Sequence, residues 1–141
     1  MAIHPYLFFN GRTDEALEFY RKALGAQLEM RMTFREAPQQ PPPGMLPPGY
    51  DDKVMHSTLR IGDAVIMATD GPTPPPGGFH GFSLSIPVPS EAEADRVFNA
   101  LIEGGKVTMP LGRTFFSPRF GTLTDRFGVN WMVIVPGPAA H

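Results

Sequence analysis

Residues 14–25 (DEALEFYRKALG) and residues 91–104 (EAEADRVFNALIEG) each predict an amphipathic helix that ends in glycine. Downstream of these helices, residues 58–67 (TLRIGDAVIM) are matched by residues 122–133 (TLTDRFGVNWMV). Both of these later stretches predict two strands around a glycine-containing turn. We interpret the pattern as an internal duplication, and each half alone is too small to bury a full core. The functional site is therefore expected where the halves meet.

Length and composition favour one soluble domain spanning residues 1–141. The net charge of −2 is spread along the chain without a basic block, so we do not expect a nucleic-acid partner. Cysteine is absent, which excludes disulfides and thiolate chemistry. The N-terminal segment has no positively charged region, and no stretch is long enough to span a bilayer. These features predict a cytoplasmic protein without a membrane partner.

The helix boundaries are predicted from capping residues and apolar spacing. Thr13 is the expected N-cap of the first helix, and Gly25 ends it. Ser90 and Glu93 form a capping box before the second helix, which the pair Gly104-Gly105 terminates. The buried stripes are expected to contain Ala16, Leu17, Tyr20, Ala23 and Leu24 in the first helix, and Ala94, Val97, Phe98, Leu101 and Ile102 in the second.

Alternating apolar and polar residues predict strands between and after the helices. Residues 28–34 and 82–86 alternate as half-buried strands do, and residues 54–61 and 64–68 flank the two-residue turn Gly62-Asp63. Residues 119–124 and 130–135 repeat this arrangement around Phe127-Gly128. Each half then has the order βαβββ, in an α+β fold whose curved mixed sheet surrounds a cavity, with helices on its other face.

Proline-rich segments separate the ordered elements. Residues 38–49 and 72–78 are rich in proline and glycine, which favours extended loops over sheet. The first module therefore covers residues 1–71, with a proline-rich loop at 37–51, and the second covers residues 79–136. An alternative role for the two segments is to act as ligands for a proline-binding partner.

The βαβββ pair resembles the glyoxalase/bleomycin resistance (vicinal oxygen chelate) superfamily, and in particular its PhnB-like branch. The resemblance is carried by PYLFFNGRTDEALEFYRKALGA, MHSTLRIGDAVIMATDG, GFSLSI with EADRVFNAL, and RFGTLTDRFGVNWMV. Relatives of this kind are often labelled 3-demethylubiquinone methyltransferase-like. The turn Asn10-Gly11-Arg12 has a single glycine rather than the glycine-rich turn of such enzymes, so we do not expect methyl transfer. The resemblance also implies a homodimer.

Metal-dependent members of this superfamily take His, Glu or Gln ligands from the first and fourth strands of each module. Here the first strand offers His4 and the fifth offers His80, whereas residues 64–68 and 130–135 contain none of these residue types. A divalent ion needs three or four nitrogen or oxygen ligands. We therefore expect no metal and no other cofactor, with His4 and His80 on the surface. A partial metal site that includes one of them stays open.

Strand parity selects the residues expected to face the cavity. His56 alternates with Ser57, so it faces the cavity if the apolar side of the strand packs on the helices, and it is the best candidate for acid or base chemistry. The alternative is a histidine whose hydrogen bonds are satisfied within the fold. By the same parity Ser83 and Ser85 line the cavity. The candidate ligand-binding residues are Tyr6, Phe8, His56, Ser83, Ser85, Arg119 and Trp131.

Aromatic and charged residues refine this site. An aromatic cavity suits a planar or apolar ligand, with Trp131 and Tyr6 as leading candidates, although core packing explains most of the aromatic residues. Arg119 would select an anion if it faced inward. Asp70 and Asp125, near strand ends, are expected in solvent or paired to hold a turn.

Two functions are compatible with these residues. The first is binding of a small apolar or aromatic molecule without a complete metal site. The alternative is a metal-dependent lyase, isomerase or dioxygenase that chelates vicinal oxygens of its substrate. The sequence leaves open whether the chain is an enzyme.

Overall fold

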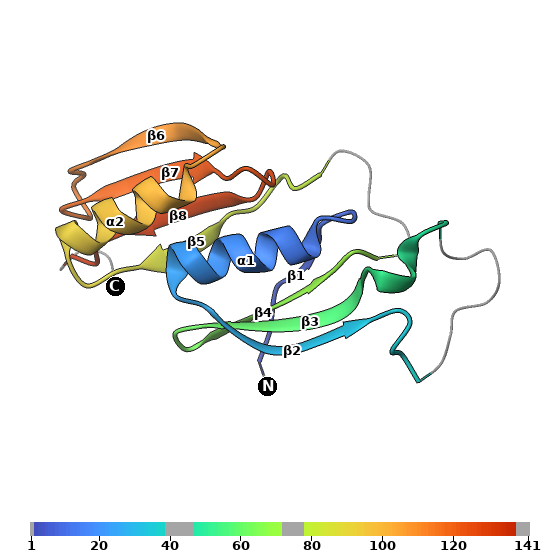
Figure 1. The fold of residues 1–141 in the computed structure, drawn as a ribbon. Helices are drawn as coiled ribbons and strands as arrows, with labels where there is room; N and C mark the ends of the chain where they lie inside the picture. The colour runs from blue at the N-terminus through green and yellow to red at the C-terminus, as the bar shows by residue number, and fades with distance from the viewer. Residues whose placement is uncertain (1, 39–46, 72–77, 138–141) are drawn as a thin grey trace. The chain divides into compact units, whose positions relative to one another are not determined.

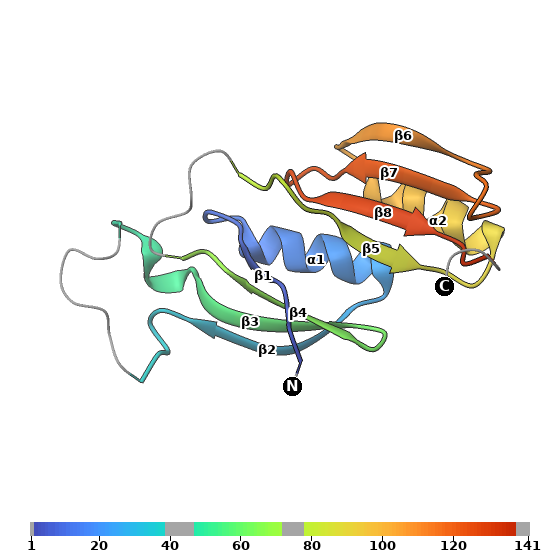
Figure 2. The ribbon, with the colours of Figure 1, turned by 180° about the vertical axis from the view of Figure 1, so that it is seen from behind.

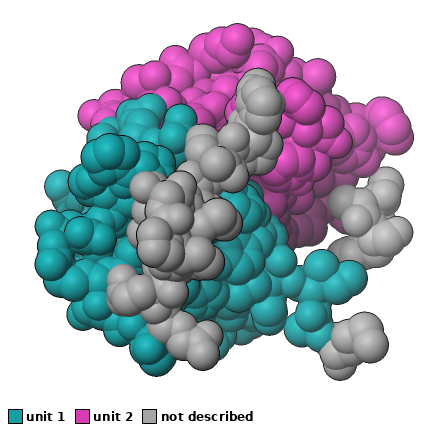
Figure 3. Space-filling model, turned by 90° about the vertical axis from the view of Figure 1, so that its right-hand side faces the viewer, with its two compact units in different colours: residues 1–76 teal, residues 77–141 magenta. Residues whose placement is uncertain are grey.

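The computed structural model describes residues 2–38, 47–71 and 78–137. The chain divides into two compact units, unit 1 at residues 1–76 and unit 2 at residues 77–141, which Figure 3 shows in different colours. The proline-rich residues 39–46 and 72–77 lie outside the described ranges, so the predictions made for them are not examined by the structure. Among the described residues, no helix combines the length and the apolar character needed to cross a membrane.

Unit 1 is a four-stranded mixed sheet with one helix packed on it (Figure 1). Its elements are β1 (Tyr6–Phe8), α1 (Thr13–Leu24), β2 (Gln27–Thr33), the short 3₁₀ helix η1 (Tyr50–Asp52), β3 (Val54–Ile61) and β4 (Ala64–Thr69). The strand order is β1-β4-β3-β2, with β1 parallel to β4 and the other pairs antiparallel. Helix α1 packs against β2 and β3.

Unit 2 repeats this topology (Figure 2). Its elements are β5 (Leu84–Pro87), α2 (Glu91–Leu101), β6 (Lys106–Gly112), β7 (Phe120–Thr124) and β8 (Asn130–Ile134). The strand order is β5-β8-β7-β6, with β5 parallel to β8. Helix α2 packs against β7 and β8. Two βαβββ modules and an α+β fold are therefore confirmed, with a separate four-stranded sheet in each module.

The strand registers show that the duplication extends to single residues. In unit 1, Tyr6 pairs with Met67, Met67 with Thr58, and Thr58 with Met30. We call such a set of residues, paired across the four strands, a row. The corresponding row of unit 2 is Ser85, Met132, Thr122 and Met109. Threonine and methionine occupy the same places in both rows, but the residues of β1 and β5 differ. The two modules therefore share a backbone pattern and differ in the chemistry of one strand.

The helices bury most of the predicted stripes, but Leu24 and Ile102 are only half-buried, and α2 ends at Leu101, before the predicted stop at Gly104-Gly105. Gly25 adopts a left-handed conformation at φ 66° and its N–H bonds to the Arg21 carbonyl. Ser90 is the N-cap of α2, where its hydroxyl accepts a bond from the Glu93 N–H. The prediction of Thr13 as N-cap is wrong, because Arg12 holds that position without a side-chain cap. Thr13 is instead the first residue of α1.

Strand β2 is more exposed than its alternating sequence predicts. Leu28 is 45% exposed and Met30 is 39% exposed. The strand lies at one edge of the sheet, so it has a neighbouring strand on one side, and its register with β3 is irregular after Leu28 and again after Met32. The prediction that these residues are half-buried is therefore wrong for most of the strand.

Candidate functional site

A tyrosine and a histidine lie together on the sheet of unit 1. The hydroxyl of Tyr6, from β1, is 2.9 Å from Nδ1 of His56, from β3. On β3 the flanking residue Ser57 is fully buried and Leu59 is 1% exposed, whereas His56 is half-buried. Because side chains alternate between the two faces of a strand, His56 lies on the face opposite α1. Two residues predicted from the sequence are thus brought into contact.

The Tyr6–His56 pair offers hydrogen bonds in both imidazole tautomers. If the Tyr6 hydroxyl donates to Nδ1, then Nε2 carries the ring proton and is a donor. If Nδ1 donates to Tyr6, then the phenol keeps its own proton for another acceptor and Nε2 accepts. Thr58 Oγ1 lies 3.5 Å from Nε2 and is the nearest additional hydroxyl. In either form the pair presents one donor and one acceptor to a ligand.

Phe8 extends this polar pair with an apolar surface. Its ring centroid lies 5.6 Å from that of Tyr6, and the Tyr6 ring lies 5.5 Å from the His56 ring. Tyr6 is 41% exposed and Phe8 is 38% exposed. Partial burial raises the pKa of the Tyr6 phenol above its ordinary value, so the phenol stays protonated at neutral pH. We call Tyr6, Phe8 and His56 the aromatic triad of unit 1.

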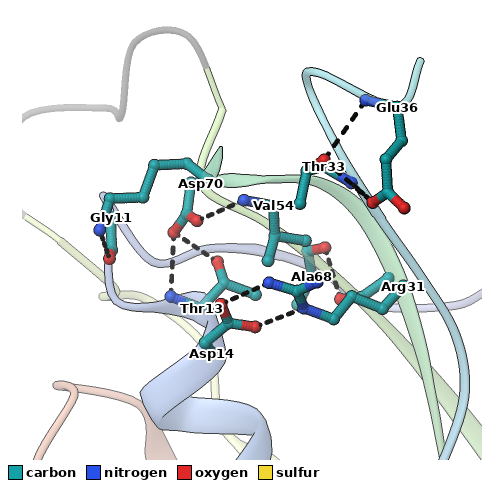
Figure 4. Close-up of polar contacts among 11 residues, drawn as sticks. Gly11, Thr13, Asp14, Arg31, Thr33, Glu36, Val54, Ala68 and Asp70 are labelled. Atoms are coloured by element: carbon teal, nitrogen blue, oxygen red, sulfur yellow. Dashed lines mark hydrogen bonds and ion pairs between the residues drawn. The ribbon is translucent and has the colours of Figure 1, made fainter. Parts of the chain in front are cut away.

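A buried carboxylate, that of Asp70, holds the start of β3, the strand that carries His56 (Figure 4). One oxygen of Asp70 accepts bonds from the backbone N–H and the hydroxyl of Thr13, at 2.9 and 2.6 Å, and the other accepts from the Val54 N–H at 2.9 Å. Asp70 is 1% exposed. It therefore joins the end of β4 to the starts of α1 and β3. The expectation that Asp70 lies in solvent or holds a turn is wrong, because its partners are the first residues of α1 and β3.

Asp125 has a more local role inside unit 2, at the turn between β7 and β8. It is 3% exposed, and one of its oxygens accepts the N–H groups of Phe127 and Val129. The other oxygen accepts the indole N–H of Trp131 at 2.8 Å. Trp131 is 2% exposed and lies in the core of unit 2. Its burial leaves no surface for a ligand within this unit, so we do not place it in the site.

The other predicted site residues of unit 2 do not form a cluster like the triad. Ser83 and Ser85 are exposed, and Ser85 pairs in register with Met132. Arg119 Nε lies 2.7 Å from Asp95 Oδ1 on α2, so its charge is directed to the helix. Counting from the matched threonines, the counterpart of His56 in unit 2 is Phe120. Unit 2 therefore lacks the tyrosine–histidine combination among its described residues.

The histidines that were considered as metal ligands belong to different units. His4 and His80 are both exposed, in unit 1 and unit 2 respectively. Across the residues described, no three or more His, Asp or Glu side chains gather closely enough to hold a metal ion. On the strands named by the resemblance, β4 and β8, the paired positions carry Met67 and Met132.

The chain belongs to the glyoxalase/bleomycin resistance protein/dioxygenase superfamily, whose family model matches residues 2–133. Protein YjdN of Escherichia coli K12 is 34% identical over 96% of this chain and 95% of its own length. The crystal structure of protein PA1353 from Pseudomonas aeruginosa matches with a TM-score of 0.84 at 46% identity, over 96% of this chain and 98% of that chain.

A further solved structure supports the PhnB-like resemblance. It is described as a putative 3-demethylubiquinone-9 3-methyltransferase, PhnB protein, from Bacillus cereus. It matches with a TM-score of 0.79 and 27% identity, and covers 96% of this chain and 99% of that chain. The superfamily and its PhnB-like branch, predicted from the sequence motifs, are confirmed.

Proposed function

We propose that this protein binds a small aromatic or apolar molecule at the aromatic triad, without a complete metal site. The observation that carries the proposal is the Tyr6–His56 hydrogen bond beside the exposed Phe8 ring. The accessible rings can stack on a planar ligand, and the polar pair beside them can fix the ligand's orientation through one hydrogen-bonding group.

The hydrogen-bonding pattern narrows the ligand class. Because Tyr6 and His56 together offer one donor and one acceptor, they match a ligand hydroxyl, which donates one bond and accepts others. The rings of Tyr6 and Phe8 match the aromatic body that carries this hydroxyl. A phenol or naphthol is therefore the ligand class that this surface fits best.

The donor chemistry of the strands supports binding without metal. Met67 and Met132 offer thioethers where the metal-dependent relatives are expected to supply carboxylate, amide or imidazole ligands. A thioether is a poor ligand for the hard and borderline divalent ions used in such sites. His56 Nδ1 is already engaged with Tyr6. Among the residues that the structure describes, no three or more His, Asp or Glu side chains offer such a cage, and we derive no chemical step through a metal.

The proposal is tested by titrating the protein with 2-naphthol in the presence of a chelator and measuring affinity by calorimetry. Tyr6→Phe removes one hydrogen-bonding group and should weaken binding about threefold to tenfold, as expected for one neutral hydrogen bond. Phe8→Ala should also weaken binding, because it removes the apolar contact.

Tyr50→Phe provides the matched control, since Tyr50 lies in the same unit and its hydroxyl bonds to the Asp70 carbonyl at 3.4 Å. Its affinity for 2-naphthol should equal that of the unmodified protein. Equal losses in Tyr6→Phe and Tyr50→Phe would refute the proposed site. Binding that appears only after a divalent ion is added would favour the metal-dependent lyase, isomerase or dioxygenase instead.

A further inference from the structure

Unit 2 contains a pocket whose lining residues belong neither to the sequence motifs described above nor to the aromatic triad. It has a volume of about 370 Å³ and is open to solvent. It lies between the β6–β7 loop and the residues that follow β8. Its lining includes Arg113, Phe115, Phe116, Pro118 and Gly137. A volume of this order is within the range of small-molecule sites.

Arg113 differs from the other arginines of the chain. All nine arginines and all Asp and Glu residues lie in the described ranges. Eight arginines form an ion pair with a carboxylate, for example Arg119 with Asp95 and Arg60 with Glu29. Among the described residues, Arg113 has no carboxylate within 4.0 Å, and it is one of the residues that line the pocket. The pocket therefore carries a positive charge that no Asp or Glu neutralises by direct pairing.

Two phenylalanine residues, Phe115 and Phe116, line the same pocket as Arg113. Phe115 is 93% exposed, and its ring packs edge-on against Phe116 with centroids 5.1 Å apart. Phe116 packs in turn on Phe120 at 5.0 Å, which anchors it to β7. A fully exposed aromatic ring is costly to leave in water, and it gives a ligand an apolar contact surface.

The loop that carries these residues is held by its own hydrogen bonds. The Thr114 N–H donates to the Ser117 carbonyl at 2.9 Å, and Thr114 Oγ1 accepts the Ser117 N–H at 3.0 Å. The Ser117 hydroxyl donates to the Val135 carbonyl at 2.7 Å, which ties the loop to the end of β8. Gly137 fits closely, since a Cβ there would lie 3.1 Å from the Phe116 carbonyl oxygen. The pocket wall is thus preorganised, which reduces the entropic cost of binding.

From these features we propose that the pocket binds a small aromatic carboxylate. The guanidinium of Arg113 binds the carboxylate, ideally through two parallel N–H bonds, while Phe115 and Phe116 contact the ring. This site lies wholly within unit 2 and takes an anionic ligand, so it is separate from the neutral aromatic site proposed on unit 1.

The test compares 2-naphthoate with its neutral isostere 2-naphthamide by calorimetry at pH 7 and low salt. The unmodified protein should bind the carboxylate more tightly. Arg113→Gln should lower the affinity for 2-naphthoate about threefold to fivefold, the range of an exposed ion pair, and leave that for 2-naphthamide unchanged. Arg21→Gln makes the same change of charge on α1, where Arg21 pairs with Glu18, and should have no such effect.

A second measurement does not depend on any variant. Addition of 2-naphthoate to the unmodified protein should shift the backbone amide signals of Thr114 and Gly137 in a saturable way. Equal affinities for the two compounds, or equal effects of Arg113→Gln and Arg21→Gln, would overturn the proposal. So would loss of 2-naphthoate binding in Tyr6→Phe with full retention in Arg113→Gln, because the compound would then occupy the aromatic triad.

Discussion

At the scale of single residues, Asp70 has the clearest structural role. Its two oxygens satisfy the N–H groups of Thr13 and Val54, which begin α1 and β3. A carboxylate at a helix N-terminus also interacts favourably with the helix dipole. Asp70 thereby fixes the strand that carries His56. The alternation of residues along a strand could not predict these hydrogen bonds, because the bonded residues lie 57 and 16 positions away from Asp70.

Asp70→Asn should therefore be strongly destabilising. The amide places an N–H₂ group where one carboxylate oxygen accepts a backbone N–H, so one buried donor loses its acceptor. The expected loss is about 1–3 kcal/mol of unfolding free energy, measured by urea denaturation. Asp63→Asn is the matched control at the exposed β3–β4 turn, and it should change stability by less than about 0.5 kcal/mol. Equal losses in the two variants would contradict this role.

Asp14 predicts a specific response to acid. Its oxygens bond to Nε and a terminal nitrogen of Arg31, both at 2.7 Å, and this hydrogen bonding lowers the pKa of Asp14 below its ordinary value of 3.8, against the opposing effect of burial. A carboxyl with a lowered folded-state pKa stabilises the fold above its unfolded pKa, and that contribution is lost as the pH falls through the folded-state value.

Asp14→Asn should consequently cost less than about 1 kcal/mol at pH 6, because the ion pair is partly exposed. The difference from the unmodified protein should shrink as the pH is lowered from 6 and Asp14 becomes protonated, as followed by urea denaturation at each pH. A difference that is constant from pH 6 to pH 2 would show that the ion pair has no part in stability.

The aromatic triad shows which part of the candidate site the sequence patterns predicted. The alternation of β3 predicted that His56 faces away from the apolar side, and β1 supplied Tyr6 and Phe8 as candidates. Their contact could not be predicted, because β1 pairs with β4 and not with β3, so Tyr6 reaches His56 across an intervening strand. Trp131 was selected for its size and polarity, but a bond to Asp125 satisfies its indole N–H inside the core.

At the scale of elements, helices were predicted more accurately than strands. The 3.6-residue period identifies the buried stripe of a helix directly, and α1 and α2 have the expected apolar faces. Alternation in a strand indicates its two faces but not its place in the sheet. Strand β2 lies at an edge of its sheet, and its apolar residues Leu28 and Met30 are exposed.

The two glycines after α2 serve different purposes, and this leads to a further prediction. Gly104 has φ +76°, whereas Gly105 lies so close to the Thr124 carbonyl oxygen that a Cβ would overlap it. Gly105→Ala should destabilise the protein by about 1–3 kcal/mol, as overpacking does. A thermal or urea unfolding experiment can measure this loss.

Gly112→Ala is the matched control in the same sheet. A Cβ at Gly112 would meet only the Pro110 carbonyl oxygen, at 4.0 Å, and the backbone there is not left-handed. The control should therefore be close to neutral. If Gly105→Ala were as well tolerated as Gly112→Ala, the close approach of residue 105 to β7 would be wrong.

At the scale of the whole molecule, the duplicated βαβββ pattern accounts for the fold, and the residues that differ between the two halves form the candidate site. The rows through Thr58 and Thr122 match residue for residue on three strands, whereas β1 has Tyr6 and β5 has Ser85. Comparison of the two halves predicted the βαβββ order of elements in each, but not the strand order within the sheets. It could not predict the pocket beside Arg113, because the β6–β7 loop at residues 113–119 differs in length and sequence from the β2–β3 connection at residues 34–53.

Binding of an aromatic molecule by Tyr6, Phe8 and His56 without a metal is tested most directly by aromatic ¹H–¹³C NMR. The unmodified protein is titrated with 2-naphthol in the presence of a chelator, and the ring signals of the triad are followed. We predict saturable shifts of the Tyr6 and His56 signals that are unchanged when Zn²⁺ replaces the chelator. Triad signals that stay fixed in the chelator and respond to 2-naphthol only after Zn²⁺ is added would contradict the proposed function.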